Sequence, residues 1–162
     1  FKENESAFIN EISKIVNSRN NVDVLLLPIG FATNHDDIIA LRSIKKKSSN
    51  RVHLFEDLNI YDIMYLISKS KMFIGSSLHG NITAMSYCVP HIGIGKKPKL
   101  ESYLSTWDLK EQNHCIEVNE MYIYFEKLLS IDIENLHNKK TEIESLVLSN
   151  FEKIIEVIIQ ES

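Results

Sequence analysis

The chain has 162 residues, of which 44% are hydrophobic, so we expect residues 1–162 to bury one core as a single domain. A net charge of −4 and a pI near 5.9 argue against a nucleic acid or an anionic membrane as partner, because both select clustered basic surfaces. The two cysteines form no metal-binding or disulfide pattern, and no apolar run could span a bilayer. These features predict a cytoplasmic protein without a transmembrane segment.

Apolar periodicity and capping residues divide the chain into alternating helices and strands. A first amphipathic helix is predicted at residues 3–19. In chain order, the sequence then predicts a strand at 22–28, a helix from a cap at Asn34 or Asp36 to Lys47, a strand at 51–55, a helix at 61–70, a strand at 72–76, a helix at 81–88, a strand at 91–94, a helix at 99–106, a strand at 115–118, a helix at 121–129 after an Asn119 cap, and a long carboxyl-terminal helix within 131–160.

This alternation predicts an α/β fold, namely a Rossmann-like, doubly wound, mostly parallel sheet with helices on both faces. Open sheets of this kind bind ligands beyond the carboxyl ends of their strands. All five glycines fall at or near such ends, where they permit tight turns and close approach to a ligand. The alternative is that they only punctuate turns. Our interpretation favours a ligand site at this edge.

The segment 72–95 contains the strongest indication of a site. An apolar strand breaks into a short polar loop just before a helix, and the loop reads Gly75-Ser76-Ser77-Leu78-His79-Gly80. A helix amino end offers unpaired N–H groups and the positive end of the helix dipole, which together favour a phosphate or carboxylate. His79 lies where such an anion would bind.

These residues resemble the signature of the polysaccharide pyruvyl transferase family, in its carboxyl-terminal, glycosyltransferase-B-like half. An upstream element with His35 also resembles one of the family, and the resemblance covers most of residues 1–130. The matching positions are Asn34-His35-Asp36-Asp37, Ser77-Leu78-His79-Gly80, Val89-Pro90, Ile92-Gly93-Ile94, Lys99, Tyr103 and Trp107-Asp108-Leu109.

The resemblance implies the donor-binding half of a transferase that moves a pyruvyl group, as a ketal, from phosphoenolpyruvate to a sugar of a cell-surface polysaccharide or exopolysaccharide. It implies an anionic donor, a glycan acceptor, no cofactor, and an amino-terminal half that lines the other wall of the cleft. His79 is the expected catalytic residue, as proton donor or phosphate ligand. The expected donor-binding residues are Ser76, Ser77, Leu78, Gly80, Asn81, Lys99, His35 and Asp37.

Several of these residues have plainer interpretations. A histidine at a strand end is often a hydrogen-bonded turn residue, and Asp36 and Asp37 suit a helix amino end by charge alone. Family members with arginine before Leu-His use its guanidinium on the donor, whereas this chain has Ser77 there. The remaining histidines lack the spacing of a metal site, so no metal is expected; they are His53, His91, His114 and His137.

Two other classes of function stay open. A glycosyltransferase or a sugar-nucleotide epimerase would bind a diphosphate at the same helix end, but it usually shows an acidic residue for the ribose, and the helix at 81–88 has none. A non-catalytic binding module is the third interpretation.

The long carboxyl-terminal helix carries an apolar stripe that requires a partner surface: Ile143, Val147, Phe151, Ile154 and Ile158. Its expected partner is the amino-terminal half, and a homodimer through this helix is an alternative. A third outcome is that the stripe folds back onto the helices of this domain.

Overall fold

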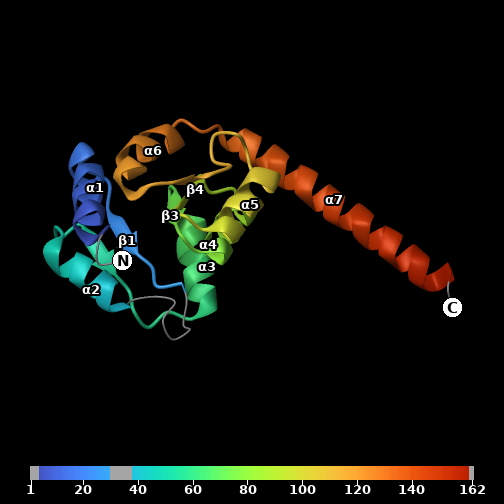
Figure 1. The fold of residues 1–162 in the computed structure, drawn as a ribbon, viewed down its shortest axis with the longest axis horizontal. Coiled ribbons are helices and arrows are strands. Elements are labelled where there is room, and N and C mark those ends of the chain that lie inside the picture. The colour runs from blue at the N-terminus through green and yellow to red at the C-terminus, as the bar shows by residue number, and fades with distance from the viewer. Residues whose placement is uncertain (1–3, 30–37, 161–162) are drawn as a thin grey trace.

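The computed structural model describes residues 4–29 and 38–160, in which helices and strands alternate (Figure 1). The helices are α1 (Glu5–Ser18), α2 (Ile38–Lys47), α3 (Ile60–Lys69), α4 (Leu78–Ser86), α5 (Pro98–Trp107), the 3-10 helix η2 (Val118–Glu120), α6 (Met121–Leu128) and α7 (Ile133–Gln160). The strands are β1 (Val24–Leu26), β2 (Val52–Leu54), β3 (Phe73–Gly75), β4 (His91–Ile94) and β5 (Cys115–Ile116).

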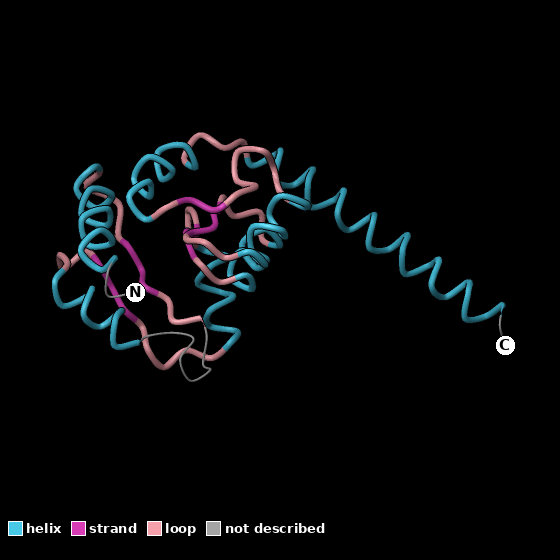
Figure 2. The backbone as a smooth tube through the Cα atoms, viewed as in Figure 1, coloured by secondary structure: helices cyan, strands magenta, loops and turns pink. Residues whose placement is uncertain are grey.

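Every strand pair in the described part of the chain is parallel, as the alternating pattern predicted. β1 pairs with β2, while β3, β4 and β5 form a separate ladder in that order (Figure 2). Within the second ladder, Gly75 lies opposite Gly93, so the carboxyl ends of β3 and β4 meet at one edge. The Rossmann-like α/β fold is therefore confirmed, with its hydrogen-bonded ladder in two pieces.

Helices cover the strands in two groups. α1 packs on α2 and α6, and α4 packs on α3 and α5 (Figure 1). A first apolar cluster joins the α1 group to both ladders; it includes Ile12, Val16, Ile44, Val52, Ile92, Ile94, Ile116 and Phe125. A second cluster fixes α3 and α4 against β3, and consists of Ile63, Ile67, Phe73, Ala84 and Val89. Because the first cluster includes residues of both ladders, apolar packing holds the two ladders together, although no backbone hydrogen bonds pair them in the described part of the chain.

Two helix starts differ from the sequence-based expectation. α4 begins at Leu78 rather than residue 81, because Ser77 caps it and draws the loop residues into its first turn. Asn119 does not cap α6. It lies within η2, where the Glu120 carboxylate accepts a hydrogen bond from the N–H of Glu117 at 2.8 Å. This bond by Glu120 places one turn of 3-10 helix directly before α6. The helical backbone therefore starts earlier than the Asn119 cap predicted.

α4 ends at a cysteine in the left-handed region. Cys88 has φ of 54°, and its N–H donates to the carbonyl of Met85 while that of Val89 donates to the carbonyl of Ala84. This pair of bonds is the Schellman arrangement, which usually uses glycine. Cys88 is buried.

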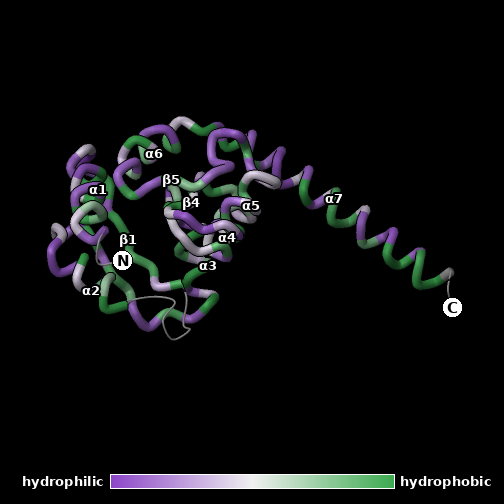
Figure 3. The backbone as a smooth tube through the Cα atoms, viewed as in Figure 1, coloured by the Kyte–Doolittle hydropathy of each residue, from purple (hydrophilic) through white to green (hydrophobic). Residues whose placement is uncertain are grey.

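α7 leaves the body of the molecule as a single extended helix (Figure 1). Its first turns reach the core, where Leu136 is buried, whereas the side chains of residues 144–159 are exposed. Hydrophobic residues recur along this free length (Figure 3). None of the described helices combines the length and apolar character that crossing a lipid bilayer requires.

Candidate functional site

The turn between β3 and α4 is held in shape by two of its own side chains. The Ser77 Oγ accepts a hydrogen bond from the N–H of Gly80 at 3.2 Å and so caps the helix. Asn81 is fully buried, and its Nδ2 donates to the carbonyls of Gly75 at 3.0 Å and Ser77 at 2.8 Å. These bonds tie the end of β3 to the start of α4 and fix the loop between them.

Two glycines of the turn make room for an aromatic ring beneath it. A Cβ on Gly75 would lie 2.5 Å from the Phe73 Cζ, and one on Gly80 would lie 2.6 Å from the same atom and 2.9 Å from the Ile29 Cδ1. Contacts this short are not tolerated in a packed interior. The glycines are therefore required by the buried Phe73 ring, which supports the loop from the core side.

The opposite side of the same turn faces solvent. Ser76 and His79 are exposed, and the His79 imidazole has no hydrogen-bond partner within residues 4–29 and 38–160. In that same part of the chain, no hydrogen bond takes up the N–H groups of Leu78 and His79 in the first turn of α4. A helix start with free donors and an adjacent imidazole is an anion-binding arrangement.

A shallow groove of about 570 Å³ runs beside this helix start. Both Leu78 of the turn and Lys99, which comes from the first turn of α5, line this groove. Its lining is Leu78, Pro98, Lys99, Ser102, Tyr103, Thr106 and Trp107. The fold thus brings Lys99, an expected donor-binding residue, to the same groove as the loop motif, although the two are 21 positions apart in the chain.

The other expected site residues lie outside the described part of the chain. His35 and Asp37, with the proposed caps Asn34 and Asp36, fall within residues 30–37. Their expected place at the same edge stays a prediction. Among the residues that the structure describes, no group of three or more histidine, cysteine, aspartate or glutamate side chains could hold a metal ion.

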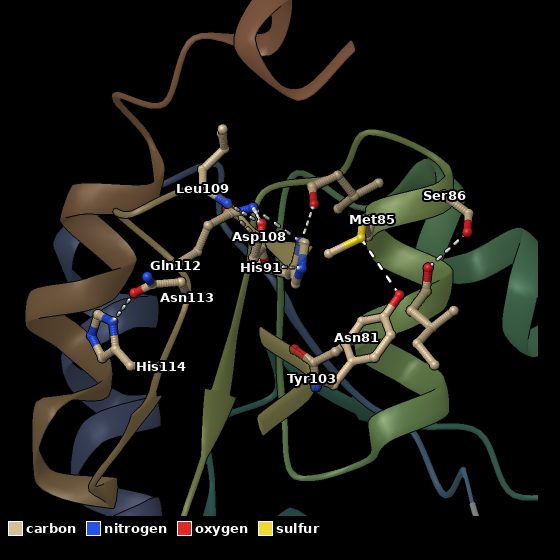
Figure 4. Close-up of polar contacts among 12 residues, drawn as sticks. Asn81, Met85, Ser86, His91, Tyr103, Asp108, Leu109, Gln112, Asn113 and His114 are labelled. Atoms are coloured by element: carbon tan, nitrogen blue, oxygen red, sulfur yellow. Dashed lines mark hydrogen bonds and ion pairs between the residues drawn. The ribbon is translucent and has the colours of Figure 1, made fainter. Parts of the chain in front are cut away.

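Sequence reasoning missed a buried polar cluster at the start of β4 (Figure 4). The His91 Nε2 lies 2.8 Å from the Asp108 Oδ2, and both side chains are at most 1% exposed. The Nδ1 of His91 lies 2.8 Å from the carbonyl of Val89, and the other Asp108 oxygen accepts from the Gln112 Nε2 at 2.7 Å and from the N–H of Leu109 at 2.8 Å. Both imidazole nitrogens are therefore held by polar contacts inside the core.

This cluster was detectable in principle. His91 opens a strand whose other residues are apolar or glycine, and a buried ionisable side chain requires a partner. Asp108 is the C-cap of α5, so the pair fixes the end of α5 to the start of β4. Its role is structural, because both histidine nitrogens are already engaged.

Burial also sets the acidity of three groups near the site. It raises the pKa of the Tyr103 hydroxyl, to which the Asp108 charge adds, and it raises the pKa of the Cys88 and Cys115 thiols. Thiols with a raised pKa carry little thiolate at neutral pH and are poor nucleophiles. Neither cysteine therefore suits covalent catalysis.

Comparison with known proteins gives one finding. The family model of polysaccharide pyruvyl transferase matches residues 2–98, which include the strand, turn and helix of the candidate site. No curated protein and no solved structure matches the chain. Since the family model covers more than half of the sequence, the chain belongs to the polysaccharide pyruvyl transferase family.

Proposed function

We propose that this chain is the donor-binding half of a cytoplasmic transferase that moves a pyruvyl group from phosphoenolpyruvate to a polysaccharide sugar as a ketal. The observation that carries the proposal is the first turn of α4, where free N–H donors and the exposed His79 face solvent over a turn fixed by Ser77 and Asn81. That turn lies inside the family match.

The turn suits the charged groups of phosphoenolpyruvate. Its phosphate would accept from the N–H groups of Leu78 and His79 and from the Ser76 hydroxyl, with the helix dipole favouring the negative charge. Lys99 supplies a cation that can approach from α5. These contacts hold the donor without a metal.

The chemistry requires one proton for the donor. In our proposal, His79 protonates the methylene carbon of phosphoenolpyruvate, which leaves an oxocarbenium-like centre at C2. One hydroxyl of the acceptor sugar then forms a C–O bond to C2, the C2–O bond to phosphate breaks, and a second hydroxyl forms the other C–O bond to C2. One hydroxyl proton restores His79 and the other leaves with the phosphate, so atoms and charge balance.

Ser77 has a positioning part in this proposal. Its Oγ is occupied by the N–H of Gly80, so it shapes the helix start and does not replace the guanidinium that resembled family members carry at this position. In our proposal, the positive charge that this guanidinium would supply comes instead from Lys99 or from the amino-terminal half. A glycosyltransferase that binds a nucleotide sugar at this turn remains the second candidate, favoured by the same helix-end geometry.

The experiment is calorimetric titration of the chain with phosphoenolpyruvate. We expect saturable binding that weakens at least tenfold in His79→Ala and is unchanged in His53→Ala, an exposed histidine on β2 that serves as the matched control. Equal affinity in the wild type and His79→Ala would refute the assignment. Binding of a nucleotide sugar but not of phosphoenolpyruvate would favour the glycosyltransferase.

Catalysis is expected to need both halves, because the reacting groups must be held within hydrogen-bonding reach of the donor. We therefore expect this chain to bind the donor but to release no phosphate in a coupled assay with sugar acceptors. Sustained turnover by this chain alone would contradict the two-half arrangement.

We also propose that the exposed apolar face of α7 packs on the amino-terminal half, with a homodimer as the alternative. Its support is the exposure of large apolar side chains on this helix, namely Leu146, Val147, Leu148, Phe151, Ile154, Ile155, Val157, Ile158 and Ile159. Concentration-dependent sedimentation that Phe151→Glu abolishes would support the homodimer. A wild-type chain that stays monomeric at all concentrations would leave the amino-terminal half as the proposed partner.

A further inference from the structure

One face of α5 lines the groove along its whole length. The lining residues of α5 form two rows with a spacing of four, which places them on neighbouring tracks of a single helical face: Pro98, Ser102 and Thr106 in one row and Lys99, Tyr103 and Trp107 in the other. The opposite side of α5 is buried in the core through Leu100 and Leu104. Nine residue steps make the lined track about 13 Å long.

The chemistry of this track changes along its length. Lys99 lies in the first turn of α5, whereas Tyr103 and Trp107 lie one and two turns farther along the helix, beside the hydroxyl-bearing Ser102 and Thr106. A single cation among rings and hydroxyls is a poor match for a strongly charged ligand. It matches a ligand that has both apolar faces and hydroxyl edges.

The aromatic end of the track is fixed in place. The Tyr103 hydroxyl contacts the Met85 sulfur at 3.7 Å, which anchors the ring against α4 (Figure 4). Trp107 directly precedes Asp108, whose two carboxylate oxygens are held by His91, Gln112 and the N–H of Leu109. A binding surface that is already ordered loses little conformational entropy when a ligand arrives.

We propose that the groove along α5 holds a neutral saccharide chain of the acceptor, with a sugar ring stacked on Tyr103 and Trp107 and the reacting end directed toward the α4 turn. A sugar ring presents a C–H face to an aromatic ring and hydroxyls to Ser102 and to solvent, and the shallow, elongated groove suits an extended chain. This inference rests on the proposed function, since it assigns the acceptor of that transfer.

The chain contains a built-in reporter for this test, because Trp107 is its one tryptophan. Tryptophan fluorescence would be titrated with neutral trisaccharides of glucose, galactose, mannose and N-acetylglucosamine, each into the tens of millimolar range. We expect at least one of the four to give a saturable change. A flat response to all four would overturn the proposal.

Variants on α5 locate the binding. Tyr103→Ala should weaken the saturable response at least tenfold, whereas Tyr103→Phe, which keeps the ring, should stay within about twofold of the wild type. Tyr61→Ala removes an exposed tyrosine on α3 and is the matched control, with no expected change. Equal affinity in the wild type and Tyr103→Ala would place the sugar elsewhere and overturn the proposal. Near-ultraviolet circular dichroism checks that each variant keeps its packing.

The two proposals fail separately. Trisaccharide binding that depends on Tyr103, without any binding of phosphoenolpyruvate, would keep the saccharide groove and reject the donor. Phosphoenolpyruvate binding that depends on His79, without a trisaccharide response, would keep the donor site and reject the groove. Binding of both, each sensitive only to its own variant, supports the donor and acceptor assignments together.

Discussion

Two histidines at opposite edges of the β3–β4 ladder have opposite environments. His79 follows the carboxyl end of β3, is exposed, and its imidazole has no partner within residues 4–29 and 38–160. His91 opens β4 at the other edge, is fully buried, and uses both ring nitrogens in contacts with Asp108 and Val89. The same side chain is thus available for a ligand at one edge and committed to the fold at the other.

The difference follows from the topology. The carboxyl ends of parallel strands lead into helix starts, where unsatisfied N–H groups face solvent, while the amino ends receive helix termini that can be joined to the sheet by buried polar bonds. Changes at the His91 edge should therefore alter stability, and changes at the His79 edge should alter binding.

The largest effect on stability is expected from Asp108→Ala. It removes the acceptor that His91, Gln112 and the N–H of Leu109 share, and each buried donor left without a partner costs about 1–3 kcal/mol. Urea denaturation of the wild type and the variant measures this cost. Asp108→Asn keeps the shape and some hydrogen bonding, so it should lose less. A loss below about 1 kcal/mol for Asp108→Ala would show that the pair contributes little to the stability of the fold. The contrast between His91 and His79 would then not hold.

A smaller loss is expected from Gly80→Ala, because its Cβ would press on Phe73 and Ile29 and overpacking of this kind costs about 1–3 kcal/mol. The same denaturation measurement applies. Adding Phe73→Leu shortens the obstructing ring and should restore part of the loss in the double variant. Additive losses in the double variant would instead mean that the glycine is needed for another reason.

Sequence patterns predicted most of the elements and the parallel topology, and the reason lies in local chemistry. The apolar run of β4 and the periodic stripe of α7 are set by neighbouring residues alone, so their ranges agree closely with the structure, whereas the strand predicted at 22–28 is shorter, at Val24–Leu26. The loop motif of the candidate site was also visible, since Gly75, Ser77 and His79 lie together in the chain.

What the sequence could not predict depends on contacts between distant residues. His91 and Asp108 are 17 positions apart, and nothing local shows that their side chains meet in the core. The groove of α5 likewise requires α4 and α5 to pack side by side. The break between the two ladders has the same origin, because strand pairing is decided by tertiary packing rather than by the composition of each strand.

Ser77→Ala should cost about 1 kcal/mol, since it removes the hydroxyl that caps α4. Ser77→Asp keeps a capping oxygen and should restore the stability, yet its negative charge should repel an anion at the turn. Thermal unfolding and phosphoenolpyruvate titration of the two variants separate these effects. Unchanged affinity in Ser77→Asp would argue that the anion does not bind at this helix start.

The smallest change in stability is expected from His79→Ala, because the side chain is exposed and has no partner in the described part of the chain. Its free energy of unfolding should stay within about 0.5 kcal/mol of the wild type, while donor affinity falls. A marked loss of stability would show that the imidazole is committed to the fold after all, and the contrast with His91 would disappear.

The free length of α7 also determines the size of the molecule in solution. Its 28 residues extend about 42 Å as a helix, while a compact chain of this length has a radius of gyration of about 15 Å. The whole helix is therefore nearly three times as long as that radius. Because the helix is buried at Leu136 and exposed farther along, small-angle scattering should record a large maximum dimension for the mass of the chain, and sedimentation should record a high frictional ratio.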